Sequence, residues 1–222
     1  MSRGAMERER AAVAAAGREL AAGGLVIGTS GNVSLRTGEW VAVTPTGAAL
    51  AELSAADVAV VGLDGAQVAG DLAPTSELAL HLGVYGRYGS GAVVHTHAPM
   101  ATALGLVLDE LPCVHYEMLG LGGAVRVAQY ATFGSADLAA GVLDALTDRT
   151  AALLANHGAL THGPDLAAAV RATGLLEWAC TLYWRAATIG APRTLGPDQL
   201  GDVADTIAAL GYGAPRPAEP PR

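Results

Sequence analysis

Lysine is absent from this sequence of 222 residues, and all of its 13 basic residues are arginine. A mechanism that needs a lysine Schiff base is therefore excluded. Cysteine is also scarce: Cys113 and Cys180 lie far apart and in no metal-binding spacing, so we expect two buried free thiols in a reducing compartment. No apolar run reaches the roughly 18 residues that a membrane span requires, and Met1 to Arg10 is charged. These features predict a cytoplasmic protein with no membrane partner.

Basic charge is in deficit as well, because 21 acidic residues give a net charge of −8. Such a balance argues against a nucleic-acid partner and favours a small-molecule substrate. With 51% hydrophobic residues, the chain can bury a full core. We therefore expect one domain over residues 1–212. The last ten residues, 213–222, include four prolines and are predicted to form a loose tail.

The pattern of apolar, glycine and proline residues predicts helices at both ends of the chain and strands between them. We expect helices over 6–22, from Thr75 or Ser76 as N-cap to 88, and over 99–107, 135–146, 164–189 and 197–210. We expect strands over 33–35, 40–43, 58–63, 91–96, 124–127 and 151–155, with a hairpin turn at Asp64-Gly65. The predicted fold class is α/β of the α+β type, with a central mixed or mostly antiparallel sheet covered by helices. No Walker lysine and no dinucleotide-binding glycine motif is present.

The segment His95-Thr96-His97 lies in an apolar stretch that is typical of a buried strand. Residues two apart on a strand share one face, so the two imidazoles would point the same way. Glu77, just upstream, and His157, in Asn156-His157-Gly158, are the natural partners. Three histidines and a carboxylate suit Zn²⁺ or a similar divalent ion.

Three loops are rich in hydroxyl groups and glycine: GTSGNVSLR from Gly28, TPTG from Thr44 and PTSE from Pro74. Taken singly, each is an ordinary turn sequence. Near a metal site, their neutral donors and the N-terminus of the following helix would hold a phosphate group without lysine. The donors concerned are Thr29, Asn32, Thr46, Gly47, Thr75 and Ser76.

These loops, in this order and spacing, make the chain resemble class II aldolases of the fuculose-1-phosphate aldolase type. That family also contains ribulose-phosphate 4-epimerases and the adducin head domain. The resemblance extends nearly from end to end, through GTSGNVSLR, TPTG, PTSE, VVHTHA, His115-Tyr116, YATFG, NHG and Gly211-Tyr212.

The resemblance implies Zn²⁺, or another divalent ion such as Mn²⁺ or Co²⁺, bound by His95, His97 and His157. Glu77 is then a further ligand in the resting enzyme and the acid/base during turnover. The implied phosphate site consists of Thr29, Gly31, Asn32, Thr46, Gly47, Thr75 and Ser76. Tyr116 would act from a neighbouring subunit of a homotetramer, with Phe133 and Tyr212 shaping the aldehyde pocket.

The implied activity is reversible cleavage of a phosphorylated sugar, a ketose 1-phosphate, to dihydroxyacetone phosphate and an aldehyde through a zinc enediolate. L-Fuculose 1-phosphate is the first candidate substrate, and 5-deoxyribulose 1-phosphate and methylthioribulose 1-phosphate stay open. A phosphopentose 4-epimerase is an alternative, although such members typically carry aspartate at the position of Glu77. A methylthioribulose-1-phosphate dehydratase and a non-catalytic adducin-like scaffold are the others.

Other histidines and aromatic residues are predicted to be structural. His81 follows Glu77 by four residues on the same helical face, so we expect it to support the carboxylate rather than bind the metal. Trp178 and Trp184 are interpreted as core or subunit-contact residues, and Tyr130 as a packing residue.

Overall fold

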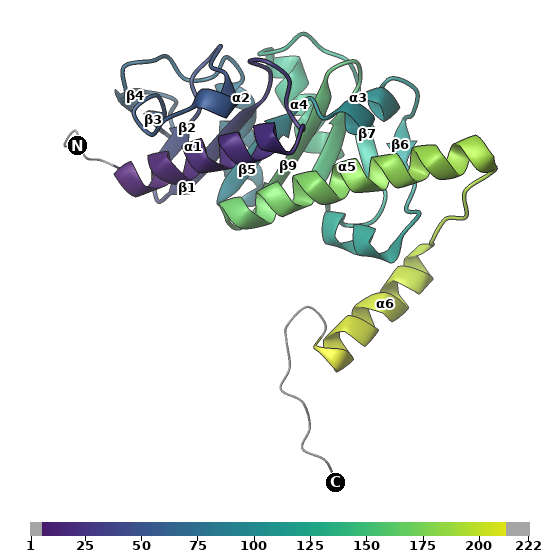
Figure 1. Cartoon of the computed structure of the whole chain (residues 1–222). Coiled ribbons are helices and arrows are strands. Elements are labelled where there is room, and N and C mark those ends of the chain that lie inside the picture. Colours follow the sequence, from purple (N-terminus) through teal and green to yellow (C-terminus); the bar gives the residue numbers. More distant parts are fainter. Residues whose placement is uncertain (1–5, 212–222) are drawn as a thin grey trace.

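The computed structural model describes residues 6–211, in which a mixed sheet is flanked by helices (Figure 1). Its strands are β1 (Asn32–Thr37), β2 (Trp40–Val43), β3 (Ala59–Gly62), β4 (Gln67–Ala69), β5 (Ala92–Thr96), β6 (Glu110–Leu111), β7 (Val125–Ala128), β8 (Ala151–Leu154) and β9 (Gly158–Gly163). Its helices are α1 (Glu7–Ala22), α2 (Leu78–Tyr88), α3 (Pro99–Gly105), α4 (Ala136–Ala145), α5 (Leu166–Ile189) and α6 (Pro197–Leu210), with 3₁₀ turns η1 (Leu50–Glu52) and η2 (Tyr116–Leu121). Tyr212 and the tail predicted for 213–222 lie outside the described residues.

The strand order is β4-β3-β2-β1-β5-β9-β8-β7-β6, and every pair is antiparallel except β7 with β8. The predicted fold class, a central mixed sheet covered by helices, is therefore confirmed. β5 is central and pairs with β1 on one side and β9 on the other. This arrangement joins the first half of the chain to the second at β5.

Most predicted elements lie within a few residues of their expected bounds. Ser135 caps α4 by accepting a hydrogen bond from the backbone N–H of Leu138, as expected. The capping residue of α2 was predicted wrongly, because Glu77 itself occupies the N-cap position and α2 begins at Leu78. α5 likewise begins at Leu166, after an Asp165 cap, rather than at Pro164. Strand β9 was not predicted, although it is a central strand.

Alternate residues of the central strands pack against different helices. Val93 of β5 lies in a cluster with α2 and α4, whereas Ala92 and Val94 pack with α1. Both faces of β5 are thus buried, which explains the apolar run with which it begins, Ala92 to Val94. His95, in phase with Val93, faces the side of α2 and α4.

The two cysteines are buried and free, as predicted. None of the helices described between residues 6 and 211 is long and apolar enough to cross a membrane. Trp178 and Trp184 are 44% and 48% exposed, so their interpretation as core residues is wrong, and a subunit contact stays a prediction. Helix α6 buries none of its residues within the chain and stands apart from the sheet (Figure 1).

Candidate metal centre and substrate cavity

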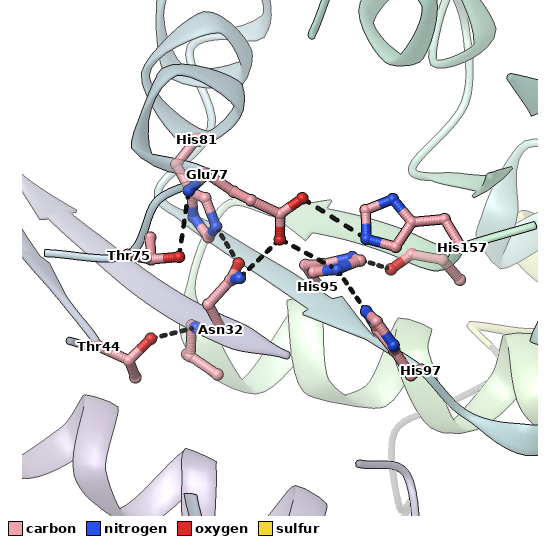
Figure 2. Close-up of polar contacts among 10 residues, drawn as sticks. Asn32, Thr44, Thr75, Glu77, His81, His95, His97 and His157 are labelled. Atoms are coloured by element: carbon pink, nitrogen blue, oxygen red, sulfur yellow. Dashed lines mark hydrogen bonds and ion pairs between the residues drawn. The ribbon is translucent and has the colours of Figure 1, made fainter. Parts of the chain in front are cut away.

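The three predicted histidine ligands come together at one end of β5 and β9. His95 is on β5, His97 follows that strand, and His157 lies in the turn between β8 and β9. The left-handed conformation of Asn156 (φ 56°), which asparagine tolerates, makes that turn tight. One ligand nitrogen from each histidine lies within 4.8 Å of the others, and the rings meet edge to face (Figure 2).

Two glycines allow the backbone to approach this closely. A Cβ atom at Gly158 would overlap the carbonyl oxygen of Thr96 and come within 3.1 Å of the His97 ring. At Gly31, where φ is +101°, a Cβ atom would lie 3.0 Å from the carbonyl oxygen of His95. Both positions therefore need glycine for the histidine strands to stay in place.

The environment of His95 leaves a bare nitrogen facing the other ligands. Its Nδ1–H donates to the carbonyl oxygen of Ala159 at 2.9 Å, so Nε2 carries a lone pair. This Nε2 lies 3.1 Å from Nε2 of His97 and 3.2 Å from Oε2 of Glu77. Burial lowers the pKa of His95 to about 4 and also lowers the pKa of His97. Neutral nitrogens and a carboxylate that converge in this way fit a divalent cation.

Glu77 is held beside these histidines with its two oxygens in different environments (Figure 2). Oε2 accepts a hydrogen bond from Nδ2 of Asn32 at 2.9 Å. Oε1 has no hydrogen-bond partner among the described residues and lies 3.6 Å from Nε2 of His157. Burial works to raise the pKa of the carboxyl, but attraction to His95 and the bond from Asn32 hold it below its usual value. The carboxylate is therefore ionised at neutral pH.

His81 is not a ligand. Its ring is fully buried, and its two nitrogens are bonded to Ser34 and Asn32 instead of facing the three histidines. Burial lowers its pKa to about 3, so it is neutral. We expected His81 to support the carboxylate, and its link to Glu77 runs through Asn32, which stands between the two side chains.

All seven residues predicted to bind phosphate line one cavity of about 450 Å³, together with Glu77, His97 and His157. Phe133, predicted for the aldehyde pocket, lines it too. The cavity wall also includes five residues that the sequence analysis did not assign to a site: Ser30, Pro45, Tyr130, Ala131 and Asn156. Tyr130 is 64% exposed, so its interpretation as a packing residue is wrong. Its place in the segment YATFG, three residues before Phe133, was the signal that indicated a site.

Tyr116 does not line this cavity within one chain. It stacks on His115, with ring centroids 4.6 Å apart, and lines a separate apolar cavity of about 360 Å³ beside α6. Val203, Ile207 and Leu210 of α6 form part of that cavity. The structure therefore brings together the residues predicted to bind metal and phosphate but not the predicted catalytic tyrosine.

A histidine triad and a carboxylate that open into a cavity lined by neutral hydroxyl and backbone groups are typical of metal-assisted enzymes acting on phosphorylated substrates. The chain belongs to the class II aldolase and adducin N-terminal domain family, whose sequence model matches residues 11–184.

Three of its relatives carry aldolase names. The chain is 35% identical to the 5-deoxy-D-ribulose 1-phosphate aldolase of Bacillus thuringiensis serovar kurstaki, over 94% of this chain and 98% of that protein. It is 36% identical to the 5-methylthioribulose-1-phosphate/5-deoxyribulose-1-phosphate aldolase of Rhodospirillum rubrum, over 92% of this chain and 93% of that protein. A solved structure of an L-fuculose 1-phosphate aldolase superposes with a TM-score of 0.87 at 31% identity, covering 90% and 96% of the two chains.

Proposed function

We propose that this class II aldolase reversibly cleaves a ketose 1-phosphate to dihydroxyacetone phosphate and an aldehyde. The observation that carries the proposal is the single cavity shared by the histidine triad, Glu77 and the three phosphate-binding loops. A phosphate group and a metal-binding carbonyl and hydroxyl pair belong to one small substrate, so their sites must lie this close together.

His95, His97 and His157 would hold the metal, for which we propose Zn²⁺ because nitrogen and carboxylate ligands suit it. When bound, the ion would polarise the substrate carbonyl and stabilise the electron pair released when the carbon–carbon bond breaks. Glu77 would carry a proton to and from the carbon that loses the aldehyde, through the unpartnered Oε1. The aldehyde oxygen begins as a hydroxyl group of the sugar, which must lose its proton as the carbon–carbon bond breaks. We assign this proton transfer to Tyr116 of a neighbouring subunit.

The phosphate would be held by hydroxyl and backbone N–H groups, because no arginine lines the described cavity. Thr75 and Ser76 precede α2, so the positive end of that helix adds attraction for an anion. Asn32 uses one N–H for Glu77 and has a second for the phosphate. Neutral donors of this kind bind a dianion without the lysine that the chain lacks.

The finer proposal is that the substrate is a 5-deoxypentulose 1-phosphate. The two relatives named above as acting on 5-deoxyribulose 1-phosphate align with more than nine tenths of this chain, which moves that sugar ahead of L-fuculose 1-phosphate. Phe133 and Tyr130 place aromatic surface on the cavity wall, which suits an aldehyde with an apolar end.

A substrate panel tests this function. With divalent metal present, 5-deoxyribulose 1-phosphate, methylthioribulose 1-phosphate and L-fuculose 1-phosphate are each supplied, and dihydroxyacetone phosphate is measured. We expect release from all three, fastest from the first. A 4-epimerised sugar phosphate or loss of water without carbon–carbon cleavage would instead support the epimerase or the dehydratase. A metallated protein that alters no sugar phosphate would favour the adducin-like scaffold.

We also propose a homotetramer whose active sites lie between subunits. Within the described residues, Val203 and Ile207 of α6 are only partly covered and Leu210 is exposed, and Tyr116 lies outside the cavity of its own chain. Mixing Tyr116→Phe subunits with His95→Ala subunits should therefore regenerate about a quarter of the native sites, those that combine the intact histidine of one variant with the intact tyrosine of the other. Subunit exchange confirmed by mass spectrometry without recovered activity would contradict a shared site.

A further inference from the structure

A chain of buried side chains runs from Glu77 into the core between α2 and β1. Glu77, His81 and Tyr85 follow one another at intervals of four residues, and so they share one face of α2. Asn32 and Ser34 are two apart on β1 and point towards that helix. Four helical residues advance by about 6 Å, and two strand residues by about 6.6 Å. The spacing of these side chains along α2 therefore matches the spacing along β1, so side chains from the helix and the strand alternate where the two elements meet.

The contacts follow this alternation without a break. Nδ2 of Asn32 lies 2.9 Å from Oε2 of Glu77, and Oδ1 of Asn32 lies 2.5 Å from Nε2 of His81. Nδ1 of His81 lies 2.6 Å from the hydroxyl of Ser34, which lies 2.5 Å from the hydroxyl of Tyr85. Each of the five residues is at most 6% exposed.

The direction of every hydrogen bond in this chain is determined by its end at Glu77. An ionised carboxylate only accepts, so Asn32 must present its NH₂ group to Glu77 and its oxygen to His81. His81 must then donate from Nε2. As a buried neutral ring it accepts at Nδ1 from Ser34, and Ser34 in turn accepts from Tyr85. All donors thus point towards the carboxylate.

We propose that His81, Ser34 and Tyr85 are positioning residues that hold the Asn32 amide, and through it Glu77, in the reactive orientation. The proposal rests on the proposed function of Glu77. Without the donor at His81, the amide oxygen of Asn32 would lose its hydrogen-bond partner. The amide group would then be free to flip, which exchanges the positions of its oxygen and nitrogen. With the donor in place, Oε2 is anchored and Oε1 is left for chemistry.

Imidazole ¹⁵N NMR of histidine-labelled, metal-free protein tests the direction of the chain without any substrate. The His81 signal, assigned by its loss in His81→Gln, should show a neutral ring protonated at Nε2 and bare at Nδ1 at pH 7. A charged ring, or one protonated at Nδ1, would overturn the proposal whatever reaction the protein catalyses.

Kinetics of matched variants then test the positioning. His81→Met removes the donor at similar volume and should lower kcat about 10- to 100-fold with KM changed less than about twofold, the usual cost of losing such a supporting partner. His81→Gln offers an N–H near the position of Nε2 and should recover most of kcat. Tyr85→Phe removes only the last donor, and we expect a loss of a few-fold.

Val84→Ala is the control, because Val84 is a fully buried residue of α2 outside the chain of hydrogen bonds. It should lower stability while kcat of the folded protein stays unchanged. If His81→Met does not fold, Tyr85→Phe carries the kinetic test. Native kcat in a folded His81→Met protein, or in its absence native kcat in Tyr85→Phe, would refute a positioning role. A wild-type protein that turns over no sugar phosphate would refute the proposed function but leave the NMR result standing.

Discussion

Removing the divalent metal with a chelator is expected to lower the release of dihydroxyacetone phosphate at least about 10³-fold, because a Lewis acid supplies several kcal/mol of transition-state stabilisation. Lysine is absent, so no Schiff base can replace it. The three histidines are arranged by the pairing of β5 with β9 and by the bond from His95 to Ala159. The fold should therefore survive chelation, and added Zn²⁺, Mn²⁺ or Co²⁺ should restore activity.

Metal content and circular dichroism check this expectation alongside the rate. His97→Ala should lose both metal and activity, whereas His115→Ala should keep the stoichiometry of one ion per chain, since His115 lies outside the triad. Full activity in a protein shown to be metal-free would contradict the mechanism.

Replacing Glu77 by glutamine is expected to lower turnover by about 10² to 10⁴, the usual range for a positioned acid or base. The variant keeps the size of the side chain, an oxygen for the hydrogen bond from Asn32, and all three histidines. It should therefore still bind metal. Exchange of a carbon-bound proton of dihydroxyacetone phosphate with deuterated water should fall in parallel, because that half-reaction needs no aldehyde.

Glu52→Gln is the matched control, since Glu52 is exposed and does not line the cavity. It should leave both rates unchanged. A Glu77→Gln protein that lost its metal, and then regained near-normal exchange in excess metal, would show that Glu77 is only a ligand. Another group would then have to move the proton.

The histidine cluster could be predicted from the sequence because His95 and His97 are two residues apart in a strand-like stretch. That spacing places both side chains on one face. The seven residues of the three loops that were predicted to bind phosphate likewise line one cavity. Strand β9 was not predicted because Gly158 to Gly163 contains few β-branched or aromatic residues. That strand exists through its pairing with β5 and β8, which local sequence does not reveal.

The hydrogen-bond partner of the Glu77 side chain also could not be predicted from local sequence patterns. Asn32 is separated from Glu77 by 45 residues and from His81 by 49, and their meeting depends on how α2 packs on β1. Asn32 was predicted to bind phosphate because of the loop in which it lies, and that role stays a prediction. The hydrogen bond from Asn32 to the Glu77 carboxylate becomes apparent only from the packing of α2 on β1.

The exposed aromatic residues of the cavity wall have a consequence for how this enzyme can diverge. Tyr130 and Phe133 are 64% and 67% exposed and lie on the connection between β7 and α4, outside the three hydrophobic clusters. Substitutions at such positions typically change the free energy of unfolding by no more than about 0.5 kcal/mol. The three histidines, in contrast, lie at the ends of central strands. Under the proposed function, substitutions at this wall can therefore change which aldehyde is accepted, with little loss of stability and without a change in the three histidines or Glu77.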